Sequence, residues 1–105
     1  MVKLTAIYGH PTDPTAFETY YAEIHAPIAM KMPYVKRLDL AKAIASPGQD
    51  QPAIYRTADI WFDNLEQCHA CLASPEGVAT GEDLAKFATG GVTLTISEVV
   101  TIQAE

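Results

Sequence analysis

Positive charge is scarce in this 105-residue chain. Seven Lys and Arg stand against thirteen Asp and Glu, which gives a formal net charge of −6 at neutral pH. The few cations are scattered, whereas sequence-independent binding of nucleic acid needs them clustered. Binding to an anionic membrane surface is disfavoured for the same reason. We therefore expect neither nucleic acid nor a membrane as a partner.

Long apolar runs are also lacking, and cysteine is rare. No apolar run reaches the ~18 residues that span a bilayer. The N-terminal letters MVKLTAIYG are too short and too alternating for a signal peptide. Two cysteines are fewer than a small secreted scaffold usually carries. The sequence thus predicts a cytoplasmic protein, and its length fits a single domain over residues 1–105.

The common cofactor and nucleophile motifs are missing. There is no G-x-G-x-x-G, no P-loop and no G-x-S-x-G, so neither nucleotide binding nor serine chemistry has support. The C-x-x-C of Cys68 and Cys71 has no second ligand pair for zinc, and Cys68 lies about a turn inside its helix, so we interpret it as a buried structural residue. The three histidines are far apart. We expect no metal and no cofactor.

The elements follow from periodicity and capping residues. Alternation predicts strands over Val2–Gly9, Tyr34–Ala45, Ala53–Phe62 and residues 90–103. Helices are expected from Asp13–Pro14, after Asp63 or Asn64, and from Ser74–Pro75 to about Ala88, because each start carries a cap signature. The last of these helices should turn Val78, Leu84 and Phe87 inward. The order β-α-β-β-α-β is that of the ferredoxin-like split βαβ arrangement. We therefore predict an α+β fold, a four-stranded antiparallel sheet with helices on one face.

The uncovered face of that sheet is expected to be half apolar, with contributions from Ile7, Tyr55, Trp61 and Val99. Such a face usually meets a partner. A homodimer that pairs two sheets face to face is the simplest solution.

The first helix combines an apolar stripe with a histidine. Its stripe is spaced by threes and fours: Phe17, Tyr21, Ile24, Ile28 and Met32. Tyr20 lies on one flank and His25 on the other. Pro27 removes one N–H and clashes with the carbonyl of Glu23, so the helix should kink or restart there.

Several polar side chains are candidates for chemistry. A histidine in a cleft could transfer protons near neutral pH, but His25 could equally lie at the rim of the core or cap a carbonyl freed by Pro27. The tyrosines could donate hydrogen bonds to a ligand or only pack. Asp59 could be a cleft acid or a surface residue. Arg56 and Glu98 interrupt apolar faces, which is explained most simply by an Arg56–Glu98 pair or by exposure.

Three segments together resemble the EthD family, named for a protein of ethyl tert-butyl ether degradation clusters. They are YGHPTDPTAFETYYAEIHAPIAMKMP, ADIWFDNLEQ and SPEGVATGEDLAKFATGGVTLTISEV, which cover nearly the whole chain in the family's order. The resemblance implies a dimeric α/β barrel with a pocket between helices and sheet in each subunit. The family's H-x-P histidine maps onto His25, and its tyrosine pair maps onto Tyr20 and Tyr21.

The resemblance also implies a function. It points to a small hydrophobic or aromatic ligand, in the oxidative degradation of ethers or xenobiotics or in the processing of aromatic or polyketide-like intermediates. An enzyme would be a cofactor-independent oxidoreductase, cyclase or isomerase, with His25 as acid or base and Tyr21 beside it. We expect further ligand contacts from Tyr20, Tyr8, Ile28, Trp61 and Asp59. The alternatives are a non-catalytic accessory or ligand-carrier subunit of an oxidative degradation system, and a haem or metal protein.

Overall fold

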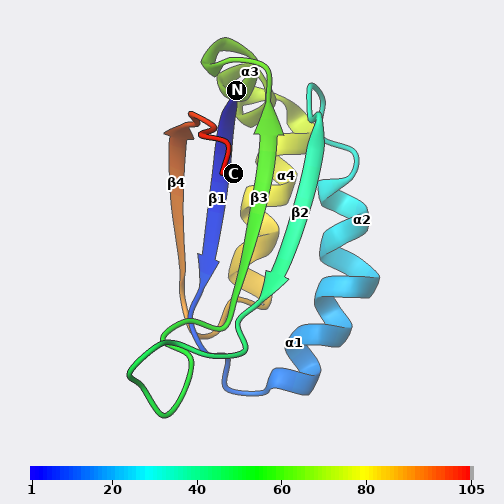
Figure 1. The fold of residues 1–105 in the computed structure, drawn as a ribbon. Coiled ribbons are helices and arrows are strands. Elements are labelled where there is room, and N and C mark those ends of the chain that lie inside the picture. Colours follow the sequence, from blue (N-terminus) through cyan, green and yellow to red (C-terminus); the bar gives the residue numbers. More distant parts are fainter. Residues whose placement is uncertain (105) are drawn as a thin grey trace.

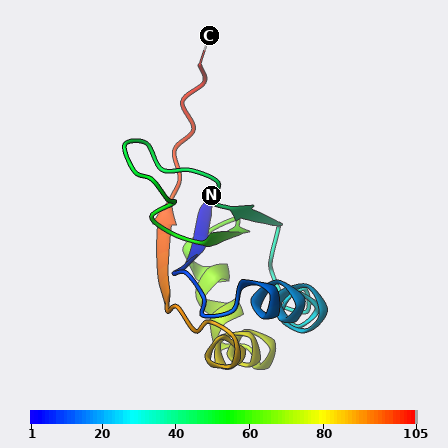
Figure 2. The same ribbon diagram turned by 90° about the horizontal axis from the view of Figure 1, so that it is seen from below.

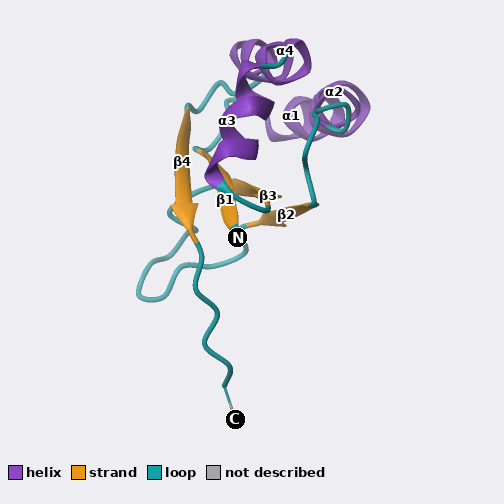
Figure 3. Ribbon diagram, turned by 90° about the horizontal axis from the view of Figure 1, so that it is seen from above, coloured by secondary structure: helices purple, strands orange, loops and turns teal. Residues whose placement is uncertain are grey.

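Four antiparallel strands form one sheet with all helices on one side. The computed structural model describes residues 1–104. The strands are β1 (Val2–Tyr8), β2 (Arg37–Lys42), β3 (Arg56–Phe62) and β4 (Val92–Glu98), in the spatial order β2-β3-β1-β4. Figures 1 and 3 show the helices stacked against one face while the other face stays uncovered. The predicted α+β, ferredoxin-like fold is confirmed.

The helices begin where capping residues predict. They are α1 (Pro14–Tyr20), a π-helical turn (Tyr21–His25), α2 (Ala26–Ala29), α3 (Leu65–Ala73), α4 (Pro75–Asp83) and a 3-10 turn (Leu84–Lys86). The side chains of Asp13, Asn64 and Ser74 each accept a hydrogen bond from a backbone N–H three residues on, which satisfies a donor of the first turn. Among the described residues, no helix is long and apolar enough to cross a membrane.

The core lies between the sheet and the helices, and strand register decides what faces it. In β1, Val2, Leu4, Ala6 and Tyr8 are buried, and each is paired with a β3 residue on the same face. Around Tyr8 the core is aromatic, because rings from α1, the π turn, the residue before β3 and the segment after α4 meet there: Phe17, Tyr21, Tyr55 and Phe87.

The π-helical turn corrects the predicted stripe of the first helix. The backbone N–H of Ala26 donates to the carbonyl of Tyr21, five residues back, which adds one residue to that turn. His25 is consequently buried at 4% exposure, whereas Ile24, expected inside, is 45% exposed. The wide turn ends two residues before Pro27, which has no N–H to donate, so the predicted interruption takes this form.

Three other expectations, for the open face of the sheet, for α4 and for the last strand, are wrong. Tyr55 is buried on the helix side next to Phe17, not on the open face. Val78 on α4 is 46% exposed. Strand β4 ends at Glu98, so Val100 and Ile102 lie beyond it at 79% and 89% exposure, in a segment that extends away from the sheet (Figure 2).

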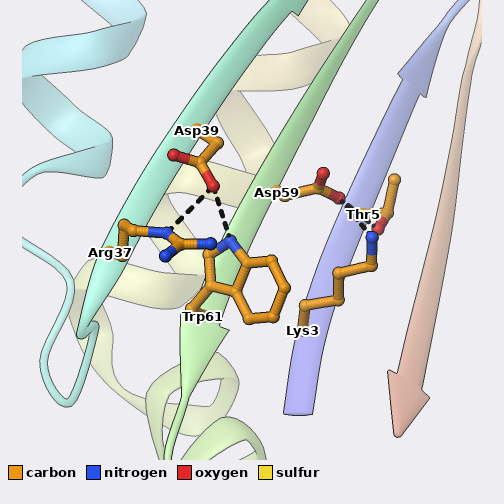
Figure 4. Close-up of polar contacts among 6 residues, drawn as sticks. All are labelled: Lys3, Thr5, Arg37, Asp39, Asp59 and Trp61. Carbon is orange, nitrogen blue, oxygen red and sulfur yellow. Dashed lines mark hydrogen bonds and ion pairs between the residues drawn. The ribbon is translucent and has the colours of Figure 1, made fainter. Parts of the chain in front are cut away.

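The open face of the sheet is more polar than expected. Asp59 accepts a hydrogen bond from Thr5 at 2.6 Å and lies 3.5 Å from Lys3 (Figure 4). Asp39 accepts from both Arg37 and the Trp61 indole, at 3.0 and 2.9 Å. The two carboxylates are directly opposed in the β2–β3 register and each has its own cation.

Arg56 faces the other way, toward the helices. Its guanidinium pairs with Glu18 at 2.6 Å, so the expected Arg56–Glu98 pair is wrong. The register gives the reason: Arg56 is paired with Tyr8 and Glu98 with Val2, at opposite ends of β1.

Candidate functional site

An apolar cavity lies between the helices and the sheet. The cavity offers about 60 Å³ to the centres of water molecules. About 10–15 Å³ of such space is enough to hold one water. Most of the wall is aliphatic, from β1, β3, α2 and α4. The polar groups that line it come from four side chains: Tyr8, Tyr21, His25 and Thr80. A cavity with an apolar wall and a few polar groups is typical of a small-molecule site.

His25 is held by a carboxylate that the sequence analysis did not identify. Its Nδ1 lies 2.8 Å from Oδ2 of Asp83, and both side chains are about 95% buried. The hydroxyl of Tyr20 donates to the other carboxylate oxygen at 2.6 Å. The ring of Phe87 packs against the imidazole, with centroids 4.6 Å apart. Tyr20, Asp83 and His25 therefore form one hydrogen-bonded chain that ends at the cavity.

The charge of Asp83 fixes the tautomer of His25. Burial by itself would raise the pKa of the Asp83 carboxyl, but the hydrogen bonds from Tyr20 and His25 and the positive charge nearby outweigh it, so the pKa lies below its ordinary value. An ionised carboxylate only accepts hydrogen bonds, so Nδ1 must carry a proton. Nε2 is then the ring nitrogen that is available to a ligand.

Two buried phenols complete the polar part of the cavity. Burial raises the pKa of Tyr8, and it also raises the pKa of Tyr21, although the nearby Tyr8 hydroxyl and the Arg56 guanidinium oppose this at Tyr21. Both phenols therefore stay protonated at neutral pH and act as hydrogen-bond donors, not as bases. Arg56 lies 5.5 Å from the Tyr21 ring centroid, where its charge favours negative charge on an oxygen nearby.

Some predicted ligand contacts lie elsewhere. Trp61 and Asp59 are on the open face of the sheet, because alternation along β3 places them opposite to Ala58 and Ile60, which line the cavity. Ile28 does not line the cavity, because the π turn moves Ala29 to the inner position. Tyr20 is separated from the cavity and binds Asp83 instead. Of the predicted set, His25, Tyr21 and Tyr8 are brought together.

Asp83 is the most important residue that sequence reasoning missed. A signal for it exists: it precedes Leu84 and lies four residues before Phe87, both of which were assigned to the inner face of this helix. An acidic residue on the inner face of an amphipathic helix requires a buried partner. Thr80, one turn earlier and also lining the cavity, supports the same assignment.

Metal and thiol chemistry have no geometric basis in the described part of the chain. Within residues 1–104, no group of three His, Cys, Asp or Glu side chains is placed to hold a metal ion. Cys68 and Cys71 are free thiols buried completely. Burial raises the pKa of both, that of Cys71 to about 11, so neither is a nucleophile at neutral pH.

Fold and site together define a ferredoxin-like α+β protein with an apolar cavity between its helices and its sheet. Residues 9–91 match the model of the EthD domain, and the chain belongs to this family. An uncharacterised 11.0 kDa protein of Rhodococcus erythropolis, from the thcB–thcC intergenic region, is 35% identical over 97% of this chain and 98% of its own length.

Solved structures agree with the fold. An EthD family protein from Bacillus halodurans superposes with a TM-score of 0.90 at 33% identity, over 95% of this chain and 99% of that one. A dimeric protein of unknown function with a ferredoxin-like fold, from Bacteroides fragilis, superposes with a TM-score of 0.63 at 17% identity, over 93% and 95% of the two chains. The latter shows similarity of fold alone.

Proposed function

We propose that the cavity binds a small apolar or aromatic compound that carries a carbonyl or phenol oxygen, and that His25 exchanges a proton with it. The observation that carries this proposal is the buried Asp83–His25 pair at 2.8 Å on the wall of an otherwise apolar cavity. Replacing such a buried pair with well-packed apolar side chains is often neutral or stabilising, so packing alone does not explain the pair. The proposed chemistry uses no cofactor.

The proposed reaction is a proton transfer next to a carbonyl group. Nε2 of His25 takes a proton from the carbon beside the carbonyl, and the electron pair of that C–H bond becomes the C=C bond of an enolate. The carbonyl π electrons move to the oxygen, which accepts hydrogen bonds from Tyr21 and Tyr8. Asp83 stabilises the imidazolium until the proton returns to carbon or oxygen. Nothing is oxidised or reduced, so an isomerase or cyclase is favoured.

Deuterium exchange on acetophenone tests the proposal without knowledge of the natural substrate. We expect the wild-type protein to exchange the methyl protons for deuterium in D₂O faster than buffer does, as followed by NMR. His25→Ala should reduce that excess rate by about 100-fold or more, the usual contribution of a general base. His69→Ala is the matched control, because His69 is exposed on α3. Equal excess rates in wild type and His25→Ala would contradict the proposal.

A second candidate function is a ligand carrier or accessory subunit of an oxidative degradation system for ethers, xenobiotics or aromatic intermediates. The apolar character of the cavity favours it, since binding needs only the wall. Wild-type protein that binds acetophenone but exchanges no protons would support this candidate and contradict the enzymatic one. A Soret band in protein purified from its native host would instead indicate a haem protein.

We also propose that two copies pair through the open faces of their sheets. Support comes from the resemblance to dimeric relatives and from the ordered side chains of that face, where Arg37 lies 4.5 Å from the Trp61 ring centroid. Analytical ultracentrifugation should give a dimer for the wild type and a monomer for Ile7→Glu, which places a charge on this face. Ile44→Glu, at a loop position 91% exposed, is the control and should stay dimeric. A monomeric wild type at 100 μM would contradict the proposal.

A further inference from the structure

The wall of the cavity is most exposed to solvent at two residues. Of the seventeen residues that line it, only Gly81 on α4 and Leu94 on β4 are exposed. Leu94 is directly opposite Ala6 in the β1–β4 register and so faces the helix side, yet it is 51% exposed. In Figure 3, α4 lies over this side of the sheet, and α1 and α2 lie over the β2 side. The opening is therefore between α4 and β4.

On the β4 side, the opening is bordered by an exposed apolar strip. Ile96 lies two residues from Leu94 on the same face of β4 and is 39% exposed. Both side chains point toward the helices without being covered by them. An apolar strip that continues from a cavity mouth extends the surface on which an apolar ligand can rest.

No local feature of the backbone or the packing requires a glycine at position 81. It lies inside α4, where glycine is a poorer helix former than alanine. A Cβ built on Gly81 meets no atom within 4 Å. Gly77, one turn earlier, is different: a Cβ there would collide with the carbonyl of Cys71, so close packing of α4 on α3 requires that glycine. Neither the packing nor the φ angle requires Gly81.

We propose that Gly81 is a specificity-determining residue that keeps the mouth of the cavity open. The ligand enters between α4 and β4, places its oxygen near His25, and rests its remaining apolar part on Leu94 and Ile96. The fitting ligand is therefore flat or chain-like and longer than the cavity, with its polar group at the inner end. The position of the ligand oxygen near His25 rests on the proposed function. The role of Gly81 depends only on the opening between α4 and β4.

Binding of 2-naphthol, measured by isothermal titration calorimetry, tests the role of Gly81. The dissociation constant should rise stepwise through Gly81→Ala, Gly81→Val and Gly81→Leu, by about tenfold or more for the last. Gly81→Ala should at the same time raise the melting temperature by about 4 °C, because alanine stabilises the helix. Ala79→Leu is the matched control, since Ala79 is exposed on α4 and does not line the cavity. It should bind 2-naphthol like the wild type.

Two results would overturn the inference. One is a wild type that does not bind 2-naphthol, because an open mouth over an apolar cavity must admit it. The other is a folded Gly81→Leu variant with an unchanged dissociation constant. The proposed function fails separately: absent deuterium exchange together with a graded loss of 2-naphthol binding would retain the mouth and reject the proton transfer.

Discussion

Replacing Asp83 is the sharpest test of how the buried polar chain contributes to stability. Its carboxylate accepts two hydrogen bonds, at 2.6 Å from Tyr20 and 2.8 Å from His25, and its residue is 3% exposed. Asp83→Ala removes both acceptor oxygens and leaves a cavity-side histidine without its partner. Asp83→Asn retains the shape and one acceptor oxygen but removes the charge.

The magnitude follows from burial. Removing one member of a buried pair typically costs about 3–5 kcal/mol, and total stability for a domain of this size is about 5–15 kcal/mol. With a urea m-value of about 1.5 kcal/mol/M, Asp83→Ala should lower the unfolding midpoint by about 2–3 M. Asp83→Asn should cost about 1.5–3 kcal/mol, the usual contribution of a hydrogen bond to a charged group.

Urea unfolding followed by far-UV circular dichroism measures these differences. The pH dependence supplies an independent check. The pKa of Asp83 is lower in the folded state than in the unfolded state, so its stabilisation is fully present above the unfolded value and is lost as pH falls through the folded value. The difference in unfolding free energy between the wild type and Asp83→Asn should therefore shrink as the pH is lowered below about 4.

Two results would refute this reasoning. One is an Asp83→Ala midpoint within 0.5 M of the wild type, which would mean that the chain from Tyr20 to His25 does not stabilise the fold. The other is a difference between wild type and Asp83→Asn that grows toward acidic pH, which would reverse the sign of the linkage.

Two further predictions concern the core. Phe87→Ala should lower the free energy of unfolding in urea by about 3–5 kcal/mol, because this 5%-exposed ring packs against five others. The control Leu65→Ala, at a position 48% exposed, should lower it by less than about 1 kcal/mol. Equal losses for the two variants would contradict the assigned core. Iodoacetamide at pH 8 should leave Cys68 and Cys71 unmodified in the native protein and alkylate both in 8 M urea, as read by mass spectrometry, since burial raises the pKa of both thiols. Native-state alkylation at the rate of a free thiol would show that α3 opens.

The fold could be predicted because its signals are local and mutually consistent. Alternation marks β1, and the pairs Asp13–Pro14 and Ser74–Pro75 mark the starts of α1 and α4. The facing of β3 could not be predicted in the same way, because both of its faces mix apolar and polar residues. Pairing with β1 decides that Trp61 and Asp59 face away from the helices, and pairing is a non-local property.

Only part of the site could be predicted from the sequence, for a related reason. His25, Tyr20 and Tyr21 lie together in one segment, so a family motif can identify them. Asp83 is 58 residues away from His25 in the sequence, and the packing of α4 against α2, which His25 directly precedes, brings their side chains within 2.8 Å. A helix-period analysis also assumes 3.6 residues per turn, which the π turn violates.

The π-helical turn decides which of two registers this helix presents to the core. In an uninterrupted α-helix the period after Tyr21 would continue through Ile24 and Ile28, both apolar, and the helix would seal the core. One extra residue in a single turn is enough to exchange Ile24 for His25 at the inner position, while Phe17 and Tyr21 remain where they are. The residues after the turn keep the register that the extra residue sets, so a deletion of Ala22 that restores a regular α-helix should leave His25 and Ala29 on the inner side.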